Sequence, residues 1–232
     1  MGEEASMNVL DPAGSAETVY AGPFGEWLAQ ARAALRGDAG VDVPCGDCTG
    51  CCTSGYSVQV RQADTRALAV IPAERLLESS FAAGQKTMLA RADGSCPMLE
   101  SGRCSIYSSR PQTCLDYDCR VFAAAGIEAG DATKAVINRR VRAWRFSHAT
   151  EDEQRMHDAV RDAAAFIQRI GDGSAGVRVP TSPMGIAVLA IKVLEVFLDP
   201  AMAGACDRRL GHAVVESARR FDRMPPLLEA SH

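Results

Sequence analysis

The chain lacks the features that identify several common protein classes. No apolar run approaches the roughly 18 residues that a membrane-spanning helix needs, and the most apolar segment is interrupted by Lys192 and Glu195. The first residues are acidic and contain no hydrophobic segment, so we expect no secretory signal. A glycine-rich phosphate loop, a dinucleotide-binding fingerprint and a G-x-S-x-G motif are all absent from the sequence, which disfavours nucleotide, NAD and serine-hydrolase chemistry.

The chain also has little net charge. Its 25 Lys and Arg residues are balanced by 29 Asp and Glu, which gives a net charge of −4 and a pI near 5.6. This balance creates no bulk attraction to nucleic acid or to an anionic membrane. We interpret the one basic run, formed by Arg139, Arg140, Arg142 and Arg145, as the solvated face of a helix. We therefore expect no membrane and no nucleic-acid partner, and the sequence identifies no substrate or protein partner.

Cysteine is the residue type that departs from ordinary globular composition. Nine cysteines are present, and eight of them lie between residues 45 and 119. We expect a cytoplasmic protein, and in that reducing compartment clustered cysteines are typical of metal ligands or redox groups rather than of disulfides. We expect the ninth, Cys206, to be a small buried residue on a helix. The candidate ligands are Cys45, Cys48, Cys51, Cys52, Cys96, Cys104, Cys114 and Cys119.

The eight candidate ligands form two clusters in the sequence. The first, residues 45–52, has the pattern C-x-x-C-x-x-C-C, and its two-residue gaps allow thiolates to turn toward one centre. The second spans residues 96–119 and begins with Cys96-Pro97. Eight thiolates suit two four-thiolate sites, or one site with four thiols left over, and spacing alone does not assign them. Adjacent residues such as Cys51 and Cys52 seldom both face one ion.

The identity of the metal has two alternatives. A C-x-x-C-x-x-C run with a later Cys-Pro is typical of ferredoxin-type loops and favours an iron–sulfur cluster, in particular a 4Fe–4S cluster, which could carry electrons. Four-thiolate Zn2+ would instead be structural, with no open coordination position. In either case we predict that the two clusters converge, with sulfurs of the two clusters within about 7 Å of each other, because loop-closure entropy grows only logarithmically with length.

Over about residues 45–120, the sequence resembles the zinc- or iron-chelating CxxCxxCC family, also called YkgJ-type proteins. The resemblance is carried, in this order, by the segments CGDCTGCC, CPML, GRCSIY, RPQTC and YDCR. The resemblance implies that the eight cysteines bind zinc or an iron–sulfur cluster. Members are often labelled iron–sulfur oxidoreductases, and a related module occurs in flagellin lysine methyltransferases. The resemblance thus allows the protein to be a redox enzyme or a cluster-assisted, methyl-transfer-like modifying enzyme. The alternative is a non-catalytic, zinc-stabilised binding module. The resemblance also suggests that Arg110 of the R-P segment, beside Tyr107, lies close to the ligands. The family's Arg after the cysteine of that segment is Leu115 here.

The remaining polar candidates carry weaker signals. Asp116 and Asp118 flank Tyr117, and residues two apart do not share a helix face, so we expect solvated or capping carboxylates rather than an acid–base pair. His148 and His157 show no metal-ligand spacing, and we expect them on the surface or in the core.

Hydrophobic periodicity predicts a mainly α protein with a small irregular and β cysteine-rich module, an α+β single domain. Thr150 and Glu153 form a capping-box pattern, and Ser182-Pro183 begins an apolar helix. Short strands are expected near residues 56–60 and 86–92. The expected organisation is a flexible tail at residues 1–22, one domain at 23–223 with the cysteine module at 45–120 and a helical shell at 131–223, and a second tail at 224–232.

Overall fold

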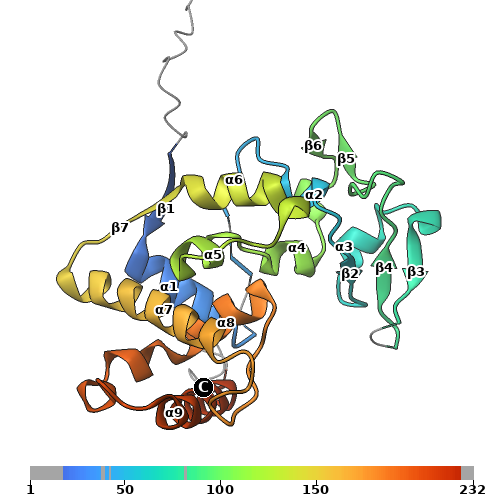
Figure 1. Ribbon diagram of the computed structural model, residues 1–232. Coiled ribbons are helices and arrows are strands. Elements are labelled where there is room, and N and C mark those ends of the chain that lie inside the picture. The colour runs from blue at the N-terminus through green and yellow to red at the C-terminus, as the bar shows by residue number, and fades with distance from the viewer. Residues whose placement is uncertain (1–17, 38–39, 42, 81–82, 226–232) are drawn as a thin grey trace, which may run out of the picture.

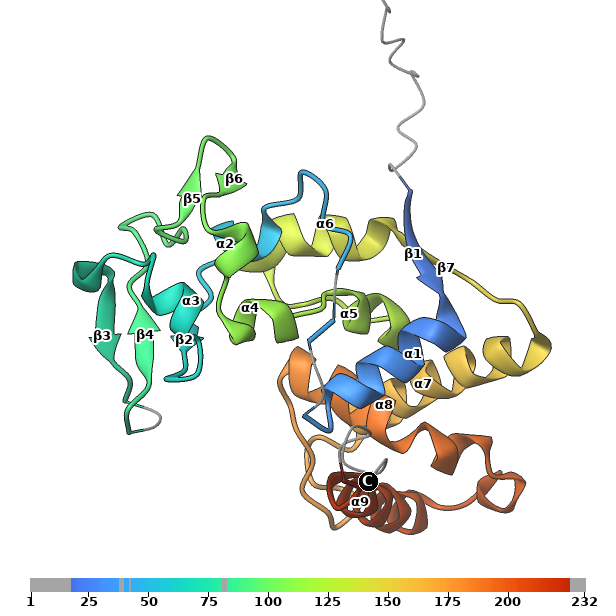
Figure 2. The ribbon, with the colours of Figure 1, turned by 180° about the vertical axis from the view of Figure 1, so that it is seen from behind.

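The computed structural model describes residues 18–37, 40–41, 43–80 and 83–225. A unit of longer helices carries the cysteine-rich segment on one side, as Figures 1 and 2 show from opposite directions. This arrangement confirms the predicted mainly α fold with a small β component. The helices are α1 (Phe24–Ala34), α2 (Gly50–Thr53), α3 (Thr65–Leu68), α4 (Gln112–Asp116), α5 (Arg120–Ala125), α6 (Ala135–Ala143), α7 (Glu151–Arg169), α8 (Pro183–Leu198) and α9 (Asp207–Asp222). The strands are β1 (Val19–Pro23), β2 (Val58–Val60), β3 (Leu76–Glu78), β4 (Lys86–Met88), β5 (Leu99–Glu100), β6 (Arg103–Cys104) and β7 (Trp144–Ser147).

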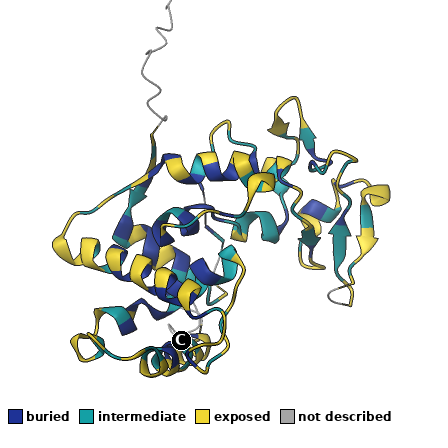
Figure 3. Cartoon of the chain, in the orientation of Figure 1, coloured by how far each residue is buried: buried dark blue, intermediate teal, exposed yellow. Residues whose placement is uncertain are grey.

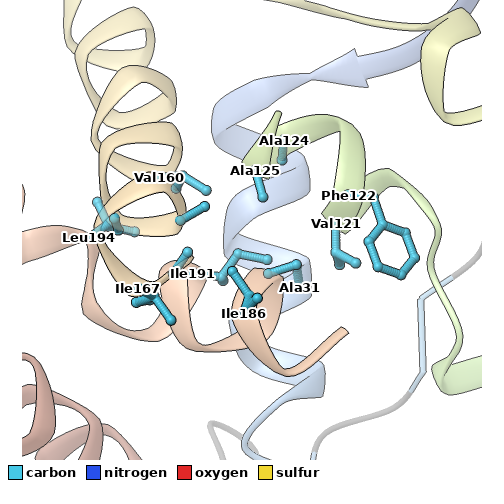
Figure 4. Packing of buried hydrophobic residues seen from close by; sticks show 14 of the residues in the cluster. Ala31, Val121, Phe122, Ala124, Ala125, Val160, Ile167, Ile186, Ile191 and Leu194 are labelled. Atoms are coloured by element: carbon cyan, nitrogen blue, oxygen red, sulfur yellow. The ribbon is translucent and has the colours of Figure 1, made fainter. Parts of the chain in front are cut away.

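The helical unit is built around α8. This helix is apolar on nearly every face because α1, α5, α7 and α9 all pack against it. Its start and that of α7 follow the predicted caps: Ser182 Oγ accepts from the Gly185 amide at 3.2 Å, and Thr150 Oγ accepts from the Glu153 amide at 3.2 Å. Figure 4 shows side chains from four helices meeting in this core, among them Ala31, Val121, Ala125, Val160, Ile167, Ile186, Ile191 and Leu194.

Two strands that the sequence analysis did not predict join the ends of the helical unit. β1 pairs in parallel with β7, and Val19 lies opposite Trp144. β1 thus occupies part of the segment for which we predicted a flexible tail, whereas residues 1–17 lie outside the described residues. The pairing fixes Trp144 at the end of α6, next to the cysteine module.

The cysteine module contains short elements and a small core of its own. β2 and β3 flank β4 in an antiparallel sheet, and β5 and β6 form a hairpin. The hairpin turns at Ser101 and Gly102, both with positive φ, which glycine adopts at little cost. Figure 3 shows many exposed and intermediate residues in this part of the chain. The buried apolar residues of this second core are Val60, Ala67, Ile71, Met88 and Met98.

Among the described residues, we find no helix of sufficient length and apolarity to span a membrane.

Removal of metal from the protein is expected to leave most of the helical signal intact. The core of the helical unit is formed mainly by side chains of α1 and α5–α9, whereas the cysteine module contributes few residues to it. Circular dichroism of chelated protein measures this directly, with the untreated protein as the reference. Complete loss of helicity would show that the cysteine module nucleates the whole domain.

Candidate metal centre

The C-x-x-C-x-x-C-C loop lies against α6. Arg140 Nη2 donates hydrogen bonds to the carbonyl oxygens of Cys45, at 2.6 Å, and Pro44, at 3.4 Å. About one turn earlier in the helix, a Cβ at Gly50 would lie 3.3 Å from the Ile137 side chain, so the loop approaches the helix at a residue without a side chain. Ile137 and Arg140 are three residues apart and therefore share a helix face. One face of α6 supports the loop.

The expectation of a solvated basic face is correct for three of the four arginines. Arg139, Arg142 and Arg145 are exposed. Arg140 is half-buried, since it is hydrogen-bonded to the loop and its guanidinium lies 4.8 Å from the centroid of the Trp144 ring. Arg140 differs from its neighbours because it contacts the cysteine loop. The local sequence does not show which of the four arginines makes this contact.

The loop itself turns tightly around its cysteines. The Cys48 amide donates to the Cys45 carbonyl at 3.0 Å, with Gly46 between them at a φ of 54°. The amide of Gly50 lies 3.5 Å from Cys48 Sγ and donates to it. α2 then carries Cys51 and Cys52, whose sulfurs are 4.0 Å apart.

The second cysteine cluster meets the first at this point. The Cys96 amide donates to the carbonyl of Cys52 at 2.7 Å, which confirms that the two clusters converge in one region. Cys96 Sγ also lies 3.8 Å from the thioether sulfur of Met88. The spacing of about 7 Å between sulfurs of the two clusters stays a prediction.

Cys119 is the most deeply placed of the candidate ligands. Burial raises the pKa of its thiol to about 12, and the charges of Asp118, Cys45 and Cys48 act in the same direction. A hydrogen bond to its sulfur from Trp144 Nε1, at 3.2 Å, opposes this rise because it stabilises the thiolate.

Cys45 is close enough to Cys119 to interact with it electrostatically. Burial raises the pKa of the Cys45 thiol to about 11, and interactions with Cys51 and Cys48 add to the rise, while the positive charge of Arg140 lowers it. We call Cys45, Cys48 and Cys119 the first thiol group.

Cys96, Cys104 and Cys114 form the second thiol group. Burial raises the pKa of the Cys114 thiol to about 12, and Cys51, Cys96 and Cys104 raise it further. The pKa of Cys96 is likewise raised, first by burial and then by Cys104 and Cys51.

Cys51 and Cys52 are adjacent residues of α2 and belong to neither group. The pKa of Cys51 is raised, first by its contact with the Cys52 sulfur and then by burial. Cys51 raises the pKa of Cys45 in the first group and of Cys96 and Cys114 in the second. Cys51 therefore interacts electrostatically with thiols of both groups.

The donor set is chemically suited to a soft or borderline metal. All nine cysteines are free thiols, and thiolate ligands select zinc and iron–sulfur clusters. Within the described ranges, no three His, Cys, Asp or Glu side chains are arranged so that they could hold one ion. The ligands must lose their protons when a metal binds, and the raised pKa values of the buried thiols therefore make binding depend on pH.

Arg110 and Tyr107 lie beside the second thiol group. The Arg110 guanidinium lies 3.9 Å from the centroid of the Tyr107 ring, and Nη1 donates to the Tyr107 carbonyl at 2.8 Å. The charge of Arg110 lowers the pKa of the Cys114 thiol, against the larger effect of burial. The role of both residues beside a bound metal stays a prediction.

For Asp118, the expectation of a solvated carboxylate is wrong, whereas the capping alternative is confirmed, since its Oδ1 accepts from the backbone amide of Arg120, where α5 begins, at 2.9 Å. Asp118 is only 4% exposed and also forms an ion pair with the Arg120 side chain, at 2.9 Å, which is itself buried. Trp27 Nε1 also donates to Asp118 Oδ2 at 2.8 Å. Asp116, in contrast, is exposed and pairs with Arg61. The signal that sequence analysis missed is the D-x-R spacing, which lets Arg120 reach back to Asp118.

Two further expectations have different outcomes. His157 lies in the core at 3% exposure, stacked on Phe24, and its Nδ1 is 2.9 Å from His148 Nε2. The expected surface or core position of these histidines is thus confirmed. The expectation that Cys206 is buried on a helix is wrong. Cys206 is exposed and immediately precedes α9.

Comparison with known proteins gives one match. Residues 44–137 match the model of the CxxCxxCC family, described as "Putative zinc- or iron-chelating domain". The matched segment contains all eight clustered cysteines and ends within α6, the helix that supports the loop. No curated protein and no solved structure matches the chain.

Proposed function

Because residues 44–137 carry the zinc- or iron-chelating CxxCxxCC domain, we propose that this protein binds metal at two four-thiolate centres. The first centre would use the first thiol group and the second centre the second thiol group. One residue of the Cys51–Cys52 pair would complete each. The observation that carries the proposal is that eight free thiols lie in the matched segment and that the bond from the Cys96 amide to the Cys52 carbonyl brings the two cysteine clusters together.

The geometry of α2 supports the division of the adjacent pair. Successive residues of an α-helix point about 100° apart, so Cys51 and Cys52 could serve neighbouring centres although their sulfurs lie 4.0 Å from each other. Cys51 interacts with thiols of both groups, and the backbone of Cys52 is bonded to that of Cys96.

Iron–sulfur clusters, of the 4Fe–4S type, are the proposed occupants, and they would supply one-electron transfer. The C-x-x-C-x-x-C run and Cys96-Pro97 favour them. The sulfurs of Cys48 and Cys119 each accept a hydrogen bond from an N–H group. Hydrogen bonds of this kind tune the reduction potentials of iron–sulfur clusters. We propose that the protein acts in the cytoplasm, where its thiols stay reduced.

A second candidate is a zinc-stabilised binding module without catalysis. The small core of the cysteine module favours it, because five buried apolar residues stabilise such a module only weakly and a structural metal would supply the remainder. Anaerobic purification followed by analysis of iron, acid-labile sulfide and zinc separates the candidates. Iron with sulfide supports clusters, zinc without iron supports the structural module, and a protein without either would refute metal binding.

Loss of one thiol from each group is expected to remove one centre only. Cys119→Ser and Cys104→Ser should each retain about half of the wild-type metal, and the double variant should retain none, because structural zinc sites and 4Fe–4S clusters are held by four ligands. Metal per chain, measured by mass spectrometry, tests this. Cys206→Ser is the matched control and should keep the full content. Complete metal loss in either single variant would show one shared centre.

A further inference from the structure

Two residues at the end of α6 contact the first thiol group from the same side. Trp144 Nε1 donates to Cys119 Sγ, and Arg140 donates to the carbonyl of Cys45. We propose that Trp144 and Arg140 are positioning residues of the first metal centre, which hold Cys119 and Cys45 in place and increase the affinity of that centre for metal. This inference rests on the proposed function and assigns a role to residues that are not themselves ligands.

The hydrogen bond from Trp144 is suited to a metal-bound sulfur. Trp144 is 3% exposed and Cys119 is also buried, so water does not compete for the indole N–H. An indole donates only, and it fixes the direction in which the sulfur accepts. A metal-bound sulfur carries negative charge, and charge-assisted hydrogen bonds are roughly twice as strong as neutral ones. The bond from Trp144 therefore stabilises the metal-bound form more than the free thiol.

Arg140 acts on the same group through the loop backbone. Its guanidinium lies over the Trp144 ring, four residues further along the chain, and Nη2 is bonded to the Cys45 carbonyl. Its Nε is buried and has no hydrogen-bond partner within the described part of the chain. Stacking on the indole restricts the guanidinium, so the arginine and the tryptophan hold each other and the two cysteines together. The positive charge also offsets the charge that thiolates bring to the centre.

The effect should be confined to the first centre. The charged groups that act on the second thiol group are Arg110, near Cys114, and Arg91, near Cys96. Among the described residues, no hydrogen bond joins Trp144 or Arg140 to that group. A change at Trp144 therefore separates a role in metal binding from a general loss of stability, which would weaken both centres.

The chain offers a matched control in its other tryptophan. Trp27 is also buried, and its indole N–H donates to Asp118, the residue next to Cys119. Trp27→Phe and Trp144→Phe each remove one buried indole donor and keep an aromatic ring. Only the second variant removes a bond to sulfur.

The test uses full-length protein with Co2+ as the probe and a competing chelator. In a Cys104→Ser background, which keeps only the first centre, Trp144→Phe should weaken Co2+ binding about 10- to 100-fold, the usual effect of losing a partner of a metal ligand. Trp27→Phe should leave the affinity within about twofold. In a Cys119→Ser background, which keeps only the second centre, neither variant should change it.

Equal affinities of Trp144→Phe and its parent, or equal losses in both tryptophan variants, would overturn the inference. If circular dichroism shows that Trp144→Phe does not fold, Arg140→Gln replaces it in the test, and exposed Arg139→Gln is its control. Arg140→Gln should weaken Co2+ binding at the first centre, whereas Arg139→Gln should not. Equal effects of the two variants would overturn the inference. Absence of Co2+ binding by the parent proteins and the wild type would instead refute the proposed function, so the two failures are distinguishable.

Discussion

Replacement of Asp118 by alanine is expected to destabilise the folded protein by about 3–5 kcal/mol, the cost of removing one partner from a buried ion pair. Asp118 accepts from Arg120 Nε at 2.9 Å and from Trp27 Nε1 at 2.8 Å. Both charged side chains are buried, at 4% and 5% exposure. Without the carboxylate, the buried guanidinium of Arg120 loses its ion pair with Asp118, and the buried indole N–H of Trp27 loses its acceptor.

Urea unfolding followed by circular dichroism measures this change. Asp116→Ala is the matched control, since Asp116 lies two residues earlier and its ion pair with Arg61 is exposed. That variant should change the free energy of unfolding by less than about 1 kcal/mol. Equal effects in the two variants would show that the buried pair adds nothing beyond a surface pair.

The position of Asp118 explains why the effect should be large. Residues 118–120 connect the cysteine module to three parts of the helical unit. Asp118 is bonded to Trp27 of α1, Cys119 to Trp144 of β7, and Arg120 Nη1 to the carbonyl of Ala21 in β1. Removal of the Asp118 carboxylate from such a junction should therefore weaken the contact between the two parts.

Acidification is expected to destabilise the helical unit through His157. Burial lowers the pKa of His157 from 6.5 to about 4, and Arg161 and His148 lower it further, whereas Asp158 acts in the opposite direction. The unfolded chain therefore takes up a proton at higher pH than the folded chain. The contribution of His157 to stability is complete above pH 6.5 and is lost as the pH falls toward 4, with a maximum of about 3 kcal/mol.

Unfolding free energies of the wild type and of His157→Phe, measured between pH 7.5 and 4.5, test this expectation. Phenylalanine keeps the stacking on Phe24, which lies 4.3 Å from the His157 ring. Acid also protonates metal-bound thiolates, so the difference between the two proteins at each pH is the relevant quantity. It should fall with decreasing pH, whereas exposed His212→Gln should follow the wild type. Parallel curves for the wild type and His157→Phe would contradict the assignment.

Short-range signals made the helices predictable. The caps at Thr150 and Ser182 lie within three residues of the amides that they bind, and the apolar stripes of α7 and α8 repeat within single helices. The strand expected at residues 86–92 was correct only in β4, residues 86–88, and β1, β3, β5, β6 and β7 were missed. These strands are two to five residues long, and pairing with distant segments rather than local periodicity defines them.

By itself, the sequence determined the helical class, the chemical nature of the donor set and the region that contains it, because these depend on residue type and local spacing. Only the tertiary structure decided which thiols interact, that Asp118 is buried and that Arg140 leaves the solvated face of α6. Each of these depends on contacts between residues far apart in the chain, such as Cys119 with Trp144 and Cys45 with Arg140. Eight similar thiols could be grouped in many ways. The fold selects one grouping, whereas the spacing of the cysteines in the sequence does not.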